Sequence, residues 1–116
     1  MPIQSLEFRG QPALSLTLPA GDRAVVALHG AHLLSWTTAD GVERIYLSPK
    51  ALFDGKSAIR GGVPVCWPQF NQRGALPKHG FARNTAWQVV PGDEGPLMLT
   101  LHDSEATRAI WPHAFR

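Results

Sequence analysis

The sequence has one cysteine, no long apolar run and no charged leader. Cys66 alone cannot build a disulfide framework, and its apolar neighbours favour a small buried residue rather than a nucleophile. No apolar stretch approaches the roughly 18 residues that cross a bilayer. The opening MPIQSLEFRG lacks the charged start and apolar stretch of a signal peptide. These absences make a cytoplasmic location the default expectation and argue against a membrane partner.

Common nucleotide-binding, hydrolytic and metal-binding motifs are also missing. The chain contains no GxGxxG, Walker loop, GxSxG or HExxH sequence. His29 and His32 are three residues apart, so a continuous strand would place them on opposite faces and make them poor partners for a metal. His102 and His113 are isolated and are predicted to be ordinary surface or core histidines. The histidines therefore give no sign of a metal site.

The composition favours a small β-rich domain. The 116 residues are 44 % hydrophobic, and 11 Gly and 10 Pro spread along the chain suit short strands joined by turns. In ALSLTL, Leu14, Leu16 and Leu18 share one face, as in a half-buried strand. The predicted fold class is all-β. Strands are expected at residues 13–18, 23–36 with a bend at Gly30, 43–48, 85–90 and 97–101, and turns at 19–22, 39–41 and 91–95.

The end of the chain predicts a further strand. Residues 109–116 read AIWPHAFR, an apolar segment that stops without a turn or a polar tail. A natural domain rarely ends on an unpaired apolar segment, because the open edge invites association. A strand that closes a small sheet is the alternative, but a truncated domain is favoured. We therefore expect self-association through unpaired strands or marginal stability, which a size measurement tests.

Positive charge is concentrated in the middle of the chain. No acidic residue lies between Asp54 and Asp93, and this interval carries five cations, whereas the remainder has six basic and nine acidic residues. Such a local excess favours an anionic ligand over a general nucleic-acid surface. A solvated basic face is an equal alternative. The five cations are Lys56, Arg60, Arg73, Lys78 and Arg83.

Residue types within this interval suit a phosphorylated polar ligand. Arg60 and Arg83 offer guanidinium forks that match phosphate oxygens in geometry and charge. Gly61 and Gly62 leave backbone accessible beside Arg60, and His79 lies close in sequence to Arg83. A single-stranded nucleic-acid binder also mixes cations with aromatics, but here prolines and loop glycines separate the cations. The aromatics are Trp67, Phe70, Phe81 and Trp87, which could stack on a sugar or form core, with core favoured for Trp67 and Trp87.

Two motifs at a defined spacing carry a resemblance to a known family. Residues 60–68 read RGGVPVCWP, and residues 76–84 read LPKHGFARN, followed by Trp87. Together they resemble the hexose-6-phosphate mutarotase (glucose-6-phosphate 1-epimerase) branch of the aldose 1-epimerase, or galactose mutarotase-like, superfamily. Members of that family are much longer than this chain. The resemblance implies that residues 1–116 are the N-terminal portion of a single antiparallel β-supersandwich domain.

The resemblance also implies a reaction, the interconversion of the α and β anomers of a hexose 6-phosphate, with glucose 6-phosphate the expected substrate. A base removes the C1 hydroxyl proton while an acid protonates the ring oxygen; the ring opens, and closure gives either anomer. The family needs no metal or organic cofactor. Its principal catalytic His and Glu lie beyond these 116 residues, so the chain alone is expected to be inactive.

Binding roles follow from the same resemblance. Arg60 and Arg83 are expected to bind the phosphate group, and His79 is expected at the sugar as a candidate assisting residue. Lys78 stands where relatives commonly have a substrate-contacting Gln, and it would add a third cation. Two other hypotheses stay open: a non-catalytic sugar-phosphate or carbohydrate-binding module, and a structural fragment whose exposed strands associate.

Overall fold

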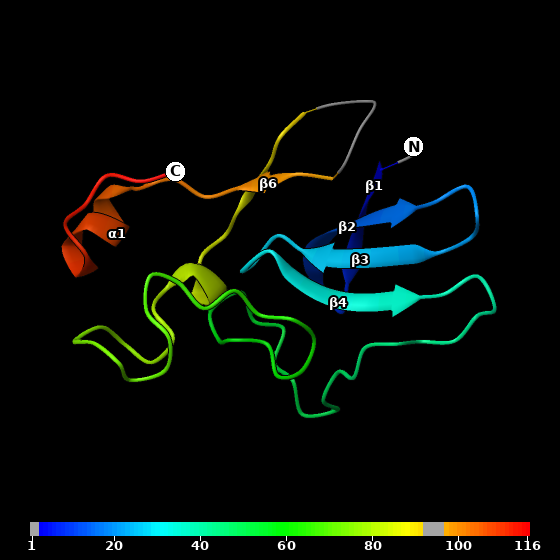
Figure 1. Cartoon of the computed structure of the whole chain (residues 1–116), viewed down its shortest axis with the longest axis horizontal. Coiled ribbons are helices and arrows are strands. Elements are labelled where there is room, and N and C mark those ends of the chain that lie inside the picture. The colour runs from blue at the N-terminus through cyan, green and yellow to red at the C-terminus, as the bar shows by residue number, and fades with distance from the viewer. Residues whose placement is uncertain (1–2, 92–96) are drawn as a thin grey trace.

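Residues 3–37 fold into a four-stranded antiparallel sheet, which confirms the β-rich prediction (Figure 1). The computed structural model describes residues 3–91 and 97–116. Each strand pairs with the next one along the chain, and the ladder between the third and fourth strands shifts register at Val25/Val26. The strands are β1 (Ile3–Phe8), β2 (Gln11–Thr17), β3 (Arg23–Ala27) and β4 (His32–Thr37).

The core lies on one face of this sheet. Ala13, Val25, Ala27 and Leu34 come from three strands, and Ile59 reaches them from a later loop. Alternate residues of a strand point to opposite faces, so these side chains can share the buried side of the sheet. Because Ile59 belongs to the core, the loop that carries it is packed against the sheet rather than free in solvent.

The strand predicted at residues 43–48 does not form as a continuous element. Only two isolated bridges occur there, Thr37 with Glu43 and Leu47 with Gly61. The Glu43 carboxylate accepts hydrogen bonds from the backbone N–H groups of Trp36, at 2.9 Å, and Ile45, at 3.1 Å. A side chain therefore satisfies donors that a ladder would otherwise pair.

The later strands are shorter than predicted. β5 (Gln88–Val89) and β6 (Leu99–Thr100) form a two-residue antiparallel pair where the sequence predicts strands at 85–90 and 97–101. The turn predicted at 91–95 lies outside the described residues, apart from Pro91. β1 is a strand that the sequence analysis did not predict, because its apolar residues do not alternate strictly.

The strand predicted at residues 109–116 is wrong. Helix α1 (Glu105–Ile110) occupies its start, and a capping box between Ser104 and Thr107 begins that helix. The remaining residues pack aromatic rings against Trp67, with centroids 5.2 Å away for Trp111 and 4.6 Å for Phe115. Ring packing, rather than strand pairing, therefore holds this apolar end of the chain.

The segment that follows Ile59 is fixed between two other backbones. Gly62 N–H donates to the Tyr46 carbonyl at 2.7 Å, and Val63 pairs with Leu33 at the outer edge of β4. A short 3-10 helix, η1 (Ala82–Asn84), lies further along the chain. In the described part of the chain no helix is long and apolar enough to cross a membrane.

Substitution of two glycines tests how tightly this segment is enclosed. Gly62 and Gly10 have positive φ angles of +64° and +84°, but a Cβ on Gly62 would overlap the Leu33 carbonyl, whereas nothing lies within 4 Å of one on Gly10. We expect Gly10→Ala to lower the free energy of unfolding by about 1 kcal/mol, the cost of left-handed backbone. Gly62→Ala adds the steric overlap and should cost at least about 3 kcal/mol. Urea unfolding followed by circular dichroism measures both, and equal losses would contradict the enclosure.

Candidate functional site

A polar cavity of about 640 Å³ brings together all four residues that the sequence analysis selected. Arg60 comes from the loop beside β4, Lys78 and His79 come from the loop before η1, and Arg83 lies in η1 itself. The two arginines are 23 residues apart in sequence but line the same cavity. The remaining lining residues are Lys50, Leu52, Ser57, Ala58, Ile59 and Gly61.

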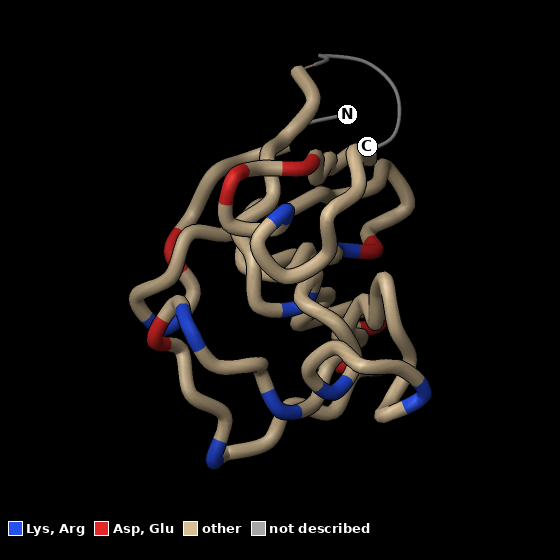
Figure 2. Tube along the Cα trace, turned by 90° about the vertical axis from the view of Figure 1, so that its left-hand side faces the viewer, with Lys and Arg blue, Asp and Glu red and all other residues tan. Residues whose placement is uncertain are grey.

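This cavity, which we call the cationic pocket, has an unbalanced charge. Its described lining contains two lysines and two arginines and no carboxylate. Figure 2 shows Lys and Arg positions along the loops in the lower part of the view, where few acidic positions lie. The neighbouring Asp54 carboxylate accepts from the Ser57 and Lys56 N–H groups at 2.7 and 2.9 Å, and these bonds lower its pKa to about 2. Asp54 therefore stays ionised, but it does not line the pocket, whose described charged residues are all cations, so the pocket suits an anion.

Backbone pairing positions the Arg60 side of the pocket. The Arg60 carbonyl accepts from Ser48 N–H at 3.1 Å, and the following Gly61 forms the bridge with Leu47. Gly61 has a φ of +93°, and a Cβ there would lie 2.8 Å from the Leu47 Cα. Only glycine fits such a close approach of two backbones. The Arg60 side chain is exposed, and its backbone is fixed on both sides.

A buried glutamine organises the opposite side. Gln69 is 8 % exposed; its amide donates to the Asn71 carbonyl at 2.8 Å, and its Oε1 accepts from Leu76 N–H at 2.9 Å. These bonds close the loop that precedes Lys78. Arg83 then donates from Nη2 to the Lys78 carbonyl at 3.1 Å. The loop and η1 are therefore held to each other, and both cations face one cavity.

His79 has a defined tautomer. Its Nδ1 accepts a hydrogen bond from Asn71 N–H at 2.8 Å, so the neutral ring carries its proton on Nε2. Partial burial, followed by the charges of Arg83 and Lys78, lowers the pKa of the imidazole below its ordinary 6.5. At neutral pH the ring is uncharged, and its Nε2–H can donate to an oxygen of a ligand.

Three residues near the pocket were missed by sequence reasoning. Lys50 lines the cavity but precedes the acid-free interval that drew attention to the other cations. His29 and His32 would lie on opposite faces of a continuous strand, but the chain turns between β3 and β4 at the predicted bend around Gly30. His29 donates from Nε2 to the Ser57 carbonyl at 3.0 Å, and His32 donates to the Gly61 carbonyl at 2.5 Å. Within residues 3–91 and 97–116 no cluster of His, Cys, Asp or Glu could hold a metal.

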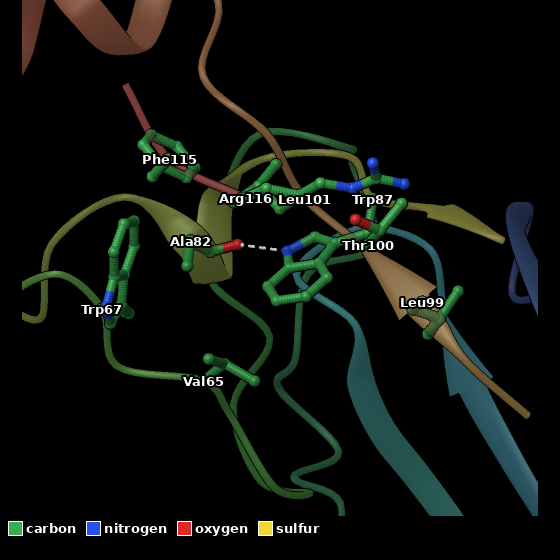
Figure 3. A pocket seen from close by; sticks show the side chains of 9 residues that line it. All are labelled: Val65, Trp67, Ala82, Trp87, Leu99, Thr100, Leu101, Phe115 and Arg116. Atoms are coloured by element: carbon green, nitrogen blue, oxygen red, sulfur yellow. Dashed lines mark hydrogen bonds between the residues drawn. The ribbon is translucent and has the colours of Figure 1, made fainter. Parts of the chain in front are cut away.

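None of the four aromatic residues of the basic interval lines the cationic pocket. Trp67 and Trp87 instead line a separate apolar cavity of about 360 Å³, together with Val65, β6 and Phe115 (Figure 3). Trp87 donates from Nε1 to the Ala82 carbonyl at 3.0 Å, the bond drawn in Figure 3. Both tryptophans are half-buried, and Trp67 lies in the aromatic cluster of the chain end. Their positions favour packing over contact with a ligand of the cationic pocket.

Comparison with known proteins places this arrangement in a family. Residues 12–116 match the family described as aldose 1-epimerase. A protein of Salmonella typhimurium, provisionally named glucose-6-phosphate 1-epimerase, is 49 % identical over 100 residues, which cover 80 % of this chain and 34 % of that protein. The crystal structure of a provisionally named mutarotase from the same organism has a TM-score of 0.83 at 38 % identity, covering 97 % of this chain and 40 % of that one. In fold alone, a galactose mutarotase related enzyme of Lactobacillus acidophilus matches with a TM-score of 0.67 at 21 % identity, over 97 % of this chain and 36 % of that one.

The chain belongs to the aldose 1-epimerase family. Its antiparallel sheets form part of a galactose mutarotase-like fold, as the resemblance implied. Two family members provisionally named glucose-6-phosphate 1-epimerase are 49 and 48 % identical to it. The chain spans about a third of the length of the curated relatives it matches.

Removing either neighbouring charge should raise the pKa of His79. Burial is the largest cause of its lowered pKa, followed by the charges of Arg83 and then Lys78. We therefore expect Arg83→Gln to raise this pKa toward the ordinary value and Lys78→Gln to raise it by a smaller amount. NMR titration of the imidazole resonances measures the change. Arg73→Gln is the matched control, because Arg73 lines a different cavity; a rise of the same size in that variant would show that the effect is not local.

Proposed function

We propose that the cationic pocket binds the phosphate group of a hexose 6-phosphate, with glucose 6-phosphate as the expected substrate. The observation that carries this proposal is the convergence of Lys50, Arg60, Lys78 and Arg83 on one cavity whose described lining has no carboxylate. We further propose that the chain is the N-terminal portion of a single mutarotase-like domain. The names of the relatives that are 41–49 % identical support this substrate class.

The four cations of the pocket and His79 each have a role in this proposal. The guanidinium forks of Arg60 and Arg83 bind phosphate oxygens, and their bidentate geometry distinguishes phosphate from a simple point charge. Lys50 and Lys78 add positive charge around the same group. His79 directs its Nε2–H toward a sugar oxygen and assists as an uncharged hydrogen-bond donor.

Binding and catalysis separate in this proposal. Anomer interconversion requires a base for the C1 hydroxyl and an acid for the ring oxygen. The described lining of the pocket offers donors and no carboxylate base, which favours a binding role for this chain and little or no activity by itself. A coupled mutarotation assay, on the 116-residue chain and on a version extended at its C-terminus, separates an enzyme from a non-catalytic sugar-phosphate-binding module. Self-association of the chain also stays a prediction.

Arg83 gives the sharpest test of the phosphate assignment. Charge-assisted bonds from Arg to phosphate contribute about 1.5–3 kcal/mol each, so Arg83→Ala should weaken glucose 6-phosphate binding by roughly ten- to a hundredfold. Arg83→Lys should restore part of the loss, because an ammonium keeps the charge but not the fork. Isothermal titration calorimetry measures both, with Arg23→Ala and Arg73→Ala as controls outside the pocket. Equal losses for glucose and its 6-phosphate would remove the phosphate role from Arg83.

Lys50 provides a second, independent test. Lys50→Ala should weaken binding of glucose 6-phosphate about threefold, since an exposed ammonium contributes less than a partly buried fork. Lys56→Ala is the matched control, because Lys56 is a nearby exposed lysine that does not line the pocket. The same calorimetric titration compares the two variants. If the Lys56 change is as large as the Lys50 change, general surface charge rather than the pocket attracts the ligand.

A further inference from the structure

We propose that His29 and His32 are positioning residues that clamp the Ser57–Gly61 wall of the cationic pocket and so place Arg60. This inference rests on the proposed function, because the wall matters for binding only if the pocket takes the phosphate. The hydrogen bonds that the two histidines donate reach only backbone carbonyls of this wall. They act on a ligand only through the backbone that they hold.

The clamp grips both ends of one short segment. His29 donates to the Ser57 carbonyl at 3.0 Å, and His32 donates to the Gly61 carbonyl at 2.5 Å. Ser57, Gly61 and all three residues between them line the pocket. Because a carbonyl can only accept, each imidazole must carry its proton on Nε2. The same side-chain type in the same tautomer therefore fixes the start and the end of the wall.

Burial makes this clamp rigid. His32 is 1 % exposed and His29 is 8 % exposed, so water does not compete for either hydrogen bond. The packing against His32 is also close, since a Cβ on Gly62 would lie 2.7 Å from its Nε2. Removing the imidazole would leave the half-buried Gly61 carbonyl without this partner, which is costly.

The turn between the two histidines also supports the opposite wall. Gly30 N–H donates to the Thr85 carbonyl at 2.8 Å, just beyond η1. A Cβ on Gly30 would lie 2.6 Å from the Arg83 carbonyl, so this turn packs directly against the Arg83 backbone. Residues 29–32 therefore contact the backbones that carry both arginines. A single turn sets the position of Arg60 relative to Arg83.

The clamp depends on the protonation state of His32. The Nδ1 atom of His32 is buried and has no hydrogen-bond partner among the described residues. Burial is the main cause that lowers the pKa of His32, with the Gly61 hydrogen bond opposing it and the charges of His29 and Arg83 adding to it. His29 and Arg83 are the titratable and charged groups that act on this ring. A second proton on Nδ1 would therefore find no acceptor and would repel Arg83.

Three variants test the clamp by calorimetry with glucose 6-phosphate. His32→Leu removes the donor, and we expect roughly tenfold weaker binding at pH 7.5, the effect of one lost buried hydrogen bond. In His32→Gln the amide nitrogen takes the place of Nε2 without titrating, so affinity should stay within about twofold of wild type. His102→Gln, at an exposed histidine outside the pocket, is the control and should change nothing.

A pH series separates positioning from simple loss of packing. From pH 7.5 to 5.5 the phosphate ligand itself takes up a proton, because its second pKa is about 6, and this affects every variant alike. Because burial lowers the pKa of His32, its ring becomes charged at a lower pH than an ordinary imidazole, and wild type should lose more affinity than His32→Gln only once that charging begins. His32→Leu binding as tightly as wild type would overturn the proposal.

A measurement made without ligand tests the clamp separately from the proposed function. If wild type fails to bind glucose 6-phosphate, the proposed function fails, and hydrogen exchange of the Gly62 amide then decides the clamp. That amide bonds to the Tyr46 carbonyl at 2.7 Å, next to the clamped carbonyl. His32→Leu should speed its exchange about tenfold, and His32→Gln should leave it near the wild-type rate. Unchanged exchange in His32→Leu would show that His32 does not hold the wall.

Discussion

The site depends on the close packing of the Gly61–Gly62 backbone between residues 46–48 on one side and Leu33 of β4 on the other. A Cβ on Gly61 would lie 2.9 Å from Ser48 N, and one on Gly62 would meet the Leu33 carbonyl on the other side. The segment therefore joins the edge of β4 to residues 46–48 with no side chain between them. Ile59 enters the core on one side of this crossing, and Arg60 points toward solvent beside it. Hydrophobic burial and the placement of Arg60 are thus fixed by the same few residues.

The like charges of the pocket act against folding. Lys50, Arg60, Lys78 and Arg83 line one cavity, and like charges brought together raise the free energy of the empty state. The fold tolerates this arrangement because glycine packing, the Gln69 hydrogen bonds and the core hold the backbone independently of the charges. An anion would then meet cations whose backbones are already held, so the cost of ordering is confined to their side chains. Salt screens such a pocket over about 10 Å at 0.1 M, so affinity should depend on ionic strength.

Sequence reasoning predicted the features that depend on a local residue pattern or on the motifs at residues 60–68 and 76–84. Alternating leucines located β2, and the acid-free interval together with the motifs selected cations that do share a cavity. It failed where a side chain distant in sequence changes the structure that the local residues favour. Glu43 takes over backbone donors that a strand would pair, and Trp67 holds the chain end by ring packing instead of a ladder. It failed at Lys50 and at His29 because their roles arise only after the chain turns back on itself.

The hydrogen-bond chemistry of the pocket limits what this part of the family fold can do. Guanidinium and ammonium groups only donate, and the Nδ1 lone pair of His79 already accepts from Asn71 N–H. The neutral imidazole can donate a hydrogen bond from Nε2–H to a sugar oxygen, but it has no free lone pair with which to accept the C1 hydroxyl proton. Ring opening needs both transfers, so under the proposed reaction the base must come from outside the described lining of the cationic pocket. Under the proposed function the pocket is therefore suited to hold the phosphate and to donate hydrogen bonds to the sugar, while proton removal falls to a group outside its described lining.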